Sequence, residues 1–229
     1  MKAMILAAGR GERMRPLTDH LPKPLLSVAG IPLIGHHLHA LARAGLTEVV
    51  INHAWLGHLL EQQLGRGEAY NVQIAYSAEG EQGLETAGGI YKALPLLGDA
   101  PFVVVNGDIF TDYPFAKLRV PREPTILAHL VLVPNPSQHP QGDFGLDAHS
   151  GLALAHAPEQ FTYSGIAWFR PEFFAEVPQG PQKLAPFLRA AMARQQITAE
   201  LYQGSWADIG TPERLAQVNQ AHRSNQHVG

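Results

Sequence analysis

Three charged residues of this chain stand in surroundings that are unusual for a solvated charge. Asp108 follows an apolar run, Asp208 lies in an apolar stretch just before a predicted helix, and Lys23 stands between Pro22 and Pro24. A buried carboxylate is costly unless it is paired or binds a metal, and Mg²⁺ prefers oxygen ligands that include carboxylates and phosphates. Two such aspartates beside phosphates point to a Mg²⁺ site, although a lone aspartate at a strand end could instead cap the next helix.

A glycine-containing loop follows the first apolar run of the chain. Residues 9–16 read GRGERMRP, and glycines permit tight turns in which successive backbone N–H groups approach phosphate oxygens. The dinucleotide-binding fingerprint requires a glycine where Met14 stands, and a Walker loop requires a Gly-Lys-Ser/Thr sequence that is missing. The loop therefore indicates phosphate binding of another kind, with an ordinary glycine turn as the alternative.

Lys23 is restricted by its neighbours. The prolines limit φ on both sides and favour an extended backbone at Lys23. A lysine that is already held in place loses little entropy when it meets a phosphate, so with Arg13, and with Arg15 as a further candidate, it could oppose a triphosphate and the charge that develops on leaving pyrophosphate. The alternative is a solvated lysine in a proline turn.

The chemistry that these residues predict is nucleotidyl transfer. Such reactions need positioning and charge neutralisation rather than a covalent protein intermediate. A phosphate oxygen of the acceptor would attack the α-phosphorus of an NTP, Asp108 and Asp208 would hold Mg²⁺ as metal ligands, and catalysis would fall to Arg13 and Lys23.

The elements that must position these residues alternate between strand and helix. Buried-strand patterns cover residues 2–7, 48–52, 72–76 and 102–106, and helical spacing covers 33–44, 57–64 and 86–94. This order predicts an α/β, Rossmann-like sheet that is mixed but mainly parallel and flanked by helices. After Asp108 the pattern becomes β-rich, so we expect one domain over 1–229, with a nucleotide-binding part at 1–110 and a β-rich part at 111–220.

Composition excludes several other classes of protein. The 229 residues carry a net charge of −3 without a basic band, which argues against a nucleic-acid partner. No apolar run approaches the roughly 18 to 20 residues that cross a membrane. The absence of cysteine fits a reducing compartment. We expect a cytoplasmic protein without a membrane partner, as a monomer or a small homo-oligomer.

Four segments in this order resemble the sugar-phosphate nucleotidyltransferases. They are residues 9–16 (GRGERMRP), 22–24 (PKP), 106–108 (NGD) and 206–212 (WADIGTP), and the resemblance runs from residue 1 to about residue 220. It implies that the first loop binds the NTP through Gly9, Gly11 and Glu12. It also implies that Arg13 and Lys23 activate the NTP while the two aspartates carry Mg²⁺.

The resemblance also implies the substrate contacts, with residues 111–220 as the sugar-binding part. A segment similar to residues 83–89 lies over the nucleobase in this family, which places Gly83 at the base, and many members carry a glycine where Glu85 stands. The short chain and the sequence LETAGG look like members that use UTP and the sugar 1-phosphate N-acetylmuramate 1-phosphate in bacterial cell-wall recycling. Asn106, Asp143 and Glu159 are then the expected sugar contacts, the last within a stretch, APEQ, that replaces the Glu-Lys-Pro of many relatives.

Three other functions share much of this pattern. Guanylyl- or thymidylyltransferases that act on mannose or glucose 1-phosphate would carry the same catalytic residues. A catalytically inactive nucleotide-sensing subunit would keep the fold but lose one of the charged groups. A nicotinamide dehydrogenase is disfavoured by Met14 and by the missing acidic residue after the second strand.

Overall fold

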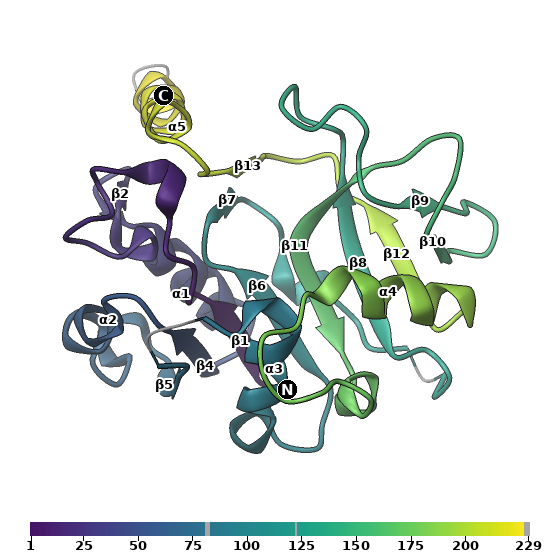
Figure 1. Ribbon diagram of the computed structural model, residues 1–229. Helices are drawn as coiled ribbons and strands as arrows, with labels where there is room; N and C mark the ends of the chain where they lie inside the picture. Colours follow the sequence, from purple (N-terminus) through teal and green to yellow (C-terminus); the bar gives the residue numbers. More distant parts are fainter. Residues whose placement is uncertain (81–82, 122, 227–229) are drawn as a thin grey trace.

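The computed structural model describes residues 1–80, 83–121 and 123–226 (Figure 1). Within these residues, seven strands form one sheet in the order β12-β8-β11-β6-β1-β4-β5, in which all neighbours except β11 run parallel. The mixed, mainly parallel sheet expected from the sequence is confirmed. The strands are β1 (Ala3–Leu6), β4 (Glu48–His53), β5 (Gln73–Ala78), β6 (Phe102–Asn106), β8 (Ala128–Val133), β11 (Thr162–Phe169) and β12 (Ile197–Leu201).

Helices cover both faces of this sheet because each buried strand is apolar on both sides. On β1, Met4 belongs to the core cluster with α3 (Glu85–Leu97) and α4 (Leu184–Ala193), whereas Ile5 belongs to the cluster with α1 (Leu33–Arg43) and α2 (Gly57–Leu64). Alternate residues of a strand point to opposite faces, so one continuous apolar run supplies both layers. Figure 1 shows α3 and α4 in front of the sheet in that view.

Shorter elements connect the layers. They are η1 (Glu12–Met14), η2 (Lys23–Leu25), β2 (Ser27–Val28), β3 (Ile31–Pro32), η3 (Glu68–Tyr70), η4 (Phe115–Lys117), β9 (Gly145–Leu146), β10 (Ala153–Leu154) and η5 (Pro171–Phe174). The β-rich pattern expected after Asp108 is found as β8, β11 and β12, with β9 and β10 as two-residue strands. No helix of the described chain is long and apolar enough to cross a membrane.

A two-stranded ribbon was not expected from the sequence. It pairs β7 (Ile109–Thr111) with β13 (Trp206–Asp208) in antiparallel register, so that Asp208 lies opposite Ile109. In Figure 1, β13 runs across the top of the molecule toward α5 (Pro212–Gln226). The final helix begins as predicted, with the Thr211 hydroxyl accepting a hydrogen bond from the Arg214 N–H at 3.4 Å.

Helix α3 packs closely against the segment before α4. The Ala87 N–H donates to the Gln182 carbonyl at 2.8 Å, and the Gln182 N–H donates to the Leu84 carbonyl at 3.0 Å. A Cβ at Gly88 would lie 2.2 Å from the Gly180 carbonyl oxygen, which belongs to backbone and cannot rotate away. Gly88 is therefore required by this close approach rather than by its φ angle.

We predict that Gly88→Ala lowers the free energy of unfolding by about 1–3 kcal/mol, because relief of the clash requires a backbone shift. Helix propensity alone predicts the opposite sign, since alanine is favoured over glycine by about 1 kcal/mol in a helix. Urea denaturation measures the difference. Gly9→Ala is the control, because a Cβ there meets no atom within 4 Å. An unchanged or raised midpoint in Gly88→Ala would contradict the packing argument.

Candidate active site

Two adjoining cavities lie where the carboxyl ends of the parallel strands meet, which is where open α/β sheets bind ligands. The inner cavity, of about 310 Å³, is lined by the glycine loop, by Lys23 and by the end of β6. The outer cavity, of about 450 Å³, is lined by the segments that follow β1, β4 and β5. Leu6, Gly9 and Thr86 line both, so the two cavities form one continuous site.

The inner cavity gathers most of the residues that the sequence predicted. Lys23 Nζ lies 2.8 Å from Asp108 Oδ2, and the lysine is only 8% exposed although its partner is open to the cavity. A lysine buried beside an aspartate is oriented before any ligand arrives. The predicted residues that line this cavity are Gly9, Gly11, Glu12, Arg13, Lys23, Asn106 and Asp108.

The backbone of Lys23 differs from the expectation. Lys23 begins the 3-10 turn η2 instead of being extended, and its carbonyl accepts a hydrogen bond from the Leu26 N–H at 3.0 Å. Pro24 fits this turn because the first positions of a helical turn need no N–H donor. The rigidity predicted for Lys23 therefore comes from a hydrogen-bonded turn and from burial.

Asp208 lies on β13 of the β7–β13 ribbon and lines neither cavity, although Gly210, two residues later, lines the inner one. The Ile209 N–H donates to the Asp108 carbonyl at 2.7 Å, so the backbone segments that carry the two aspartates lie side by side. Asp208 Oδ1 accepts a hydrogen bond from Gln138 Nε2 at 2.7 Å, and Asp208 Oδ2 forms an ion pair with Arg214. The described residues contain no group of three or more His, Asp or Glu side chains that could hold a metal.

Two carboxylates nevertheless suit Mg²⁺ at a phosphate-binding site. Mg²⁺ keeps several waters and is commonly bound by one or two carboxylates together with substrate phosphates. Asp108 and Asp208 each carry a cationic neighbour, Lys23 and Arg214.

A buried, neutral histidine lies close to Asp108. His37 on α1 is 2% exposed, and burial lowers its pKa to about 4 despite a hydrogen bond with the Ile109 backbone. Near neutral pH the ring therefore adds no positive charge near Asp108. The cations that line the inner cavity are Lys23 and Arg13.

The glycine loop is held by short contacts. Gly11 adopts a φ of 70°, and a Cβ there would lie 3.0 Å from the Thr18 side chain. The Thr18 hydroxyl donates to the Gly11 carbonyl at 2.8 Å. Arg13 is exposed along the inner cavity, whereas Arg15 is paired with Asp19 at 2.8 Å and does not line it. The structure thus favours Arg13 over Arg15 as the second cation of the site.

The outer cavity contains a buried polar network that sequence reasoning missed. Asn52 accepts a hydrogen bond from the Ala7 N–H at 2.9 Å and donates to Glu79 Oε1 at 2.6 Å. Glu79 Oε2 accepts from the Leu84 N–H at 2.6 Å. The network joins the ends of three strands to the segment that carries Gly83, which lines the outer cavity as expected. Asn52 and Glu79 end or follow buried strands, which is the signal that identified Asp108.

Glu85 occupies a backbone conformation that favours glycine. Its φ is 57°, in the left-handed region, and it lines the outer cavity. Glycine adopts this conformation without the steric cost that a side chain brings. A non-glycine residue in this conformation costs free energy and is commonly kept at functional sites.

Asn106 is positioned by a bulge in the neighbouring strand. The register of β11 against β8 shifts between Tyr163 and Ile166, and Gly165 lies in this bulge with a φ of 82°. A Cβ at Gly165 would lie 2.6 Å from Asn106 Nδ2. The bulge therefore leaves room for the Asn106 side chain beside Asp108.

The other two expected sugar contacts line neither cavity. Asp143 Oδ2 accepts a hydrogen bond from the Tyr163 N–H at 2.8 Å, and Asp143 Oδ1 lies 3.1 Å from His139 Nε2. Glu159 is exposed. The segment that contains Asp143 does reach the site, because its Gln138 contacts Asp208. Sugar binding by Asp143 and Glu159 stays a prediction.

The fold and site define an α/β protein with a glycine loop and a buried lysine–aspartate pair at the carboxyl edge of its sheet. The family model described as nucleotidyl transferase matches residues 2–150. The chain belongs to this family of enzymes.

Particular relatives support this assignment over nearly the whole chain. The chain is 53% identical to the N-acetylmuramate alpha-1-phosphate uridylyltransferase of Neisseria meningitidis, over 95% of this chain and 96% of that protein. It is 34% identical to the protein of the same name from Caulobacter vibrioides, over 92% of both chains. The mannose-1-phosphate guanylyltransferase catalytic subunit beta of Xenopus tropicalis is 32% identical, over 69% of its own length.

The fold is also found among solved structures. A Bacillus anthracis structure, described as a glucose-1-phosphate thymidylyltransferase in complex with a sucrose, superposes with a TM-score of 0.81. The alignment covers 97% of this chain and 95% of that one at 22% identity. At this identity, the likeness bears on the fold alone, and it confirms the nucleotidyltransferase fold.

We predict that Lys23→Ala lowers kcat/KM for nucleotidyl transfer by roughly 100-fold or more, because a preorganised cation is lost from the site where charge develops. Arg15→Ala is the matched control, since Arg15 pairs with Asp19 outside the inner cavity. Pyrophosphate release measures both, with circular dichroism to confirm folding. Equal losses in the two variants would remove the special role of Lys23.

We predict that Glu85→Gly raises the free energy of unfolding by up to about 1 kcal/mol. Relief of the left-handed conformation gains roughly 1–2 kcal/mol, and the greater flexibility of glycine offsets about 0.5–1 kcal/mol of it. Glu85→Ala keeps the strain and is expected to show no such gain. Chemical denaturation distinguishes the two, and a stabilised alanine variant would argue against backbone strain at Glu85.

Proposed function

We propose that this enzyme transfers UMP from UTP to the phosphate of N-acetylmuramate 1-phosphate, releasing pyrophosphate, in the recycling of bacterial cell wall. The observation that carries the proposal is the 53% identity to the Neisseria meningitidis uridylyltransferase over 95% of the chain. A relative of the same name matches over 92% of the chain. The guanylyltransferase relatives are less similar, at 31–32% identity.

In the proposed reaction, an oxygen of the acceptor's phosphate attacks the α-phosphorus of UTP in line. The bond between the α-phosphorus and the bridging oxygen breaks, and that oxygen leaves with pyrophosphate. The inner cavity supports this assignment because it gathers backbone donors at Gly9 and Gly11 with the cations Arg13 and Lys23. These groups would oppose the charge that grows on the leaving group.

Asp108 and Asp208 would hold Mg²⁺ as metal ligands. The ion would neutralise phosphate charge and keep the reacting oxygens in line. The chain's own contribution would be to join the backbone segments of the two aspartates through the β7–β13 ribbon and to keep Lys23 against Asp108.

The acceptor would lie on the side of the inner cavity where β6 ends and the β11 bulge begins. Asn106 lines this side, and Gly165 leaves its side chain room. We propose Asn106 as a contact to the sugar or its phosphate, with Asp143 and Glu159 as candidates for the sugar substituents.

The test is pyrophosphate release with purified enzyme. We expect turnover with UTP and N-acetylmuramate 1-phosphate in the presence of Mg²⁺, and its loss on addition of EDTA. A preference for GTP or dTTP, or for mannose or glucose 1-phosphate, would leave the reaction class but overturn the substrate assignment. No turnover with any pair would favour a nucleotide-sensing subunit.

We predict that Asp108→Asn and Asp208→Asn each lower kcat by roughly 100-fold or more, because each removes a charged ligand from the metal. The amide keeps the size of the side chain, so the fold is expected to persist. Asp99→Asn is the control, since Asp99 is exposed in the loop after α3.

A titration with Mn²⁺ in place of Mg²⁺ separates metal loss from other damage. Variants that lost a ligand should require more metal for half-maximal rate. Wild-type rates in either aspartate variant would remove that residue from the proposed metal site.

A further inference from the structure

An arginine and a tryptophan form a stacked pair at the wall of the outer cavity. The Arg10 guanidinium lies over the Trp55 ring, with Cζ 3.9 Å from the ring centroid. Both side chains line the outer cavity. Trp55 is 37% exposed, although a large apolar side chain is usually covered in a folded protein. Its position requires an explanation.

The pair is held rigidly by the loop beneath it. Trp55 Nε1 donates to the Thr18 carbonyl at 3.1 Å, and Arg10 Nη1 donates to the same carbonyl at 2.9 Å. Arg10 Nη2 also lies 3.3 Å from Asp19 Oδ1. Two segments distant in sequence, the glycine loop and the β4–α2 connection, are thereby fixed to one backbone atom.

The charges of the two cavities differ in a way that assigns their ligands. The inner cavity is lined by two cations, Arg13 and Lys23, and by two carboxylates, Glu12 and Asp108, a set that suits phosphates together with a divalent metal. The outer cavity contains the buried carboxylate of Glu79, which would repel phosphate, and the charge of Arg10 is already balanced by Asp19. The outer cavity therefore suits the uncharged part of a nucleotide.

We propose that the Arg10–Trp55 pair is a binding wall for the nucleoside part of the NTP and supplies a substantial share of its affinity. The inference rests on the proposed function, because it takes UTP as the donor. A rigid aromatic ring and a planar guanidinium offer flat surfaces to a base or ribose without losing further side-chain entropy on binding. The triphosphate would remain in the inner cavity.

The test compares two ligands that differ only in the nucleoside. Calorimetry measures the Kd of UTP and of inorganic tripolyphosphate, each with Mg²⁺ and without acceptor. We expect Trp55→Ala to weaken UTP by roughly 5- to 100-fold, the range found when a stacking aromatic is removed, and to leave tripolyphosphate within about twofold. Trp55→Phe keeps an aromatic face and should retain most of the UTP affinity.

Leu96→Ala is the matched control, because Leu96 is also a large exposed apolar residue, at 38%, and lies away from both cavities. It should change neither Kd. Unchanged UTP binding in Trp55→Ala would overturn the proposal. Equal weakening of UTP and tripolyphosphate would also overturn it, because it would mean that Trp55 only anchors the phosphate loop.

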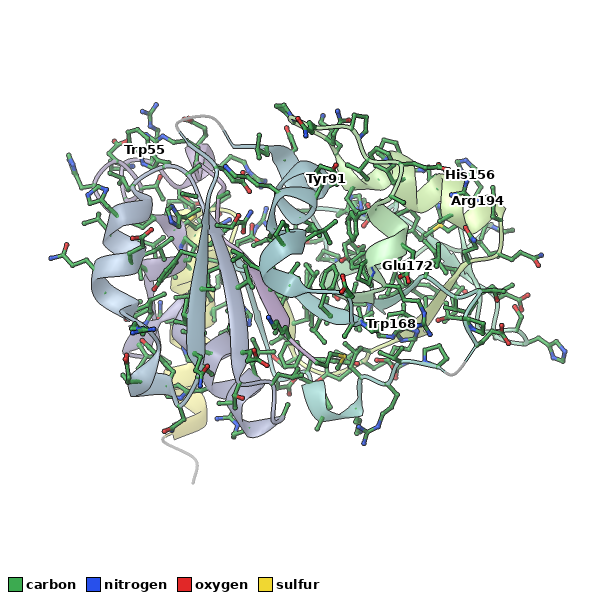
Figure 2. The ribbon with its side chains drawn as sticks, turned by 90° about the horizontal axis from the view of Figure 1, so that it is seen from below. Trp55, Tyr91, His156, Trp168, Glu172 and Arg194 are labelled. Carbon is green, nitrogen blue, oxygen red and sulfur yellow. The ribbon has the colours of Figure 1, made fainter. Side chains whose placement is uncertain are left out.

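Tryptophan fluorescence gives a second readout that does not depend on turnover. Trp55 lies far from the buried Trp168 (Figure 2), and the remaining tryptophan, Trp206, is on β13. UTP should change the emission of the wild type, and Trp55→Phe should remove most of that change. A change that persists in full in Trp55→Phe would contradict direct contact.

The outcome is separable from that of the proposed function. If the enzyme prefers GTP or dTTP in turnover assays, the substrate assignment fails, and the same comparison is made between that nucleotide and tripolyphosphate. Loss of nucleotide affinity in Trp55→Ala would then still support nucleoside binding by the Arg10–Trp55 pair. Retention of that affinity would overturn this role of the pair even if UTP proved to be the donor.

Discussion

The active site depends on one short pairing of strands. β13 joins β7 in antiparallel register and places Asp208 opposite Ile109, and the Ile209 N–H donates to the Asp108 carbonyl. These hydrogen bonds bring the backbone around Asp208 alongside that of Asp108, while the two carboxylates bind different cations, Arg214 and Lys23. Helix α5 continues from β13 and is tied to the N-terminal part by Asn219, whose side chain bonds the Ala29 N–H at 2.8 Å. The C-terminal helix is thereby attached to the N-terminal segment that contributes to the site.

Each of the two aspartates beside this strand pairing forms an ion pair with a cation. Lys23 contacts Asp108, and Arg214 contacts Asp208, so neither carboxylate is left without a cationic neighbour. The arrangement lets acidic groups sit close to bound phosphates without the desolvation cost of an unpaired charge. In the outer cavity, the Glu79 carboxylate accepts hydrogen bonds from the Asn52 side chain and the Leu84 N–H. Its described hydrogen bonds include none from a cation. The inner cavity is thus lined by charges of both signs, whereas the outer cavity contains a buried carboxylate held by hydrogen bonds.

This separation explains how one scaffold serves relatives with different substrates. In the proposed reaction, the groups that oppose phosphate charge would line the inner cavity and would be needed whatever nucleotide or sugar is used. Contacts that distinguish substrates would then fall to its surroundings, such as the outer cavity and the β11 bulge beside Asn106. Relatives named for N-acetylmuramate and for mannose accordingly match this chain over most of its length.

The order of strands and helices and the residues of the inner cavity could be read from local sequence. Apolar runs specify buried parallel strands because both faces are covered, and a charged residue at the end of such a run must lie at the ligand-binding edge, as Asp108 does. The 3-10 turn at Lys23 was not foreseen, since the proline rule considers only adjacent residues and ignores the hydrogen bonds that close the turn. The β7–β13 ribbon, the Asn52–Glu79 network and the Arg10–Trp55 stack were decided by tertiary structure. Each joins segments far apart in the chain, and contacts of that kind leave no local pattern in the sequence, because the energy that selects them exists only once the sheet has brought the segments together.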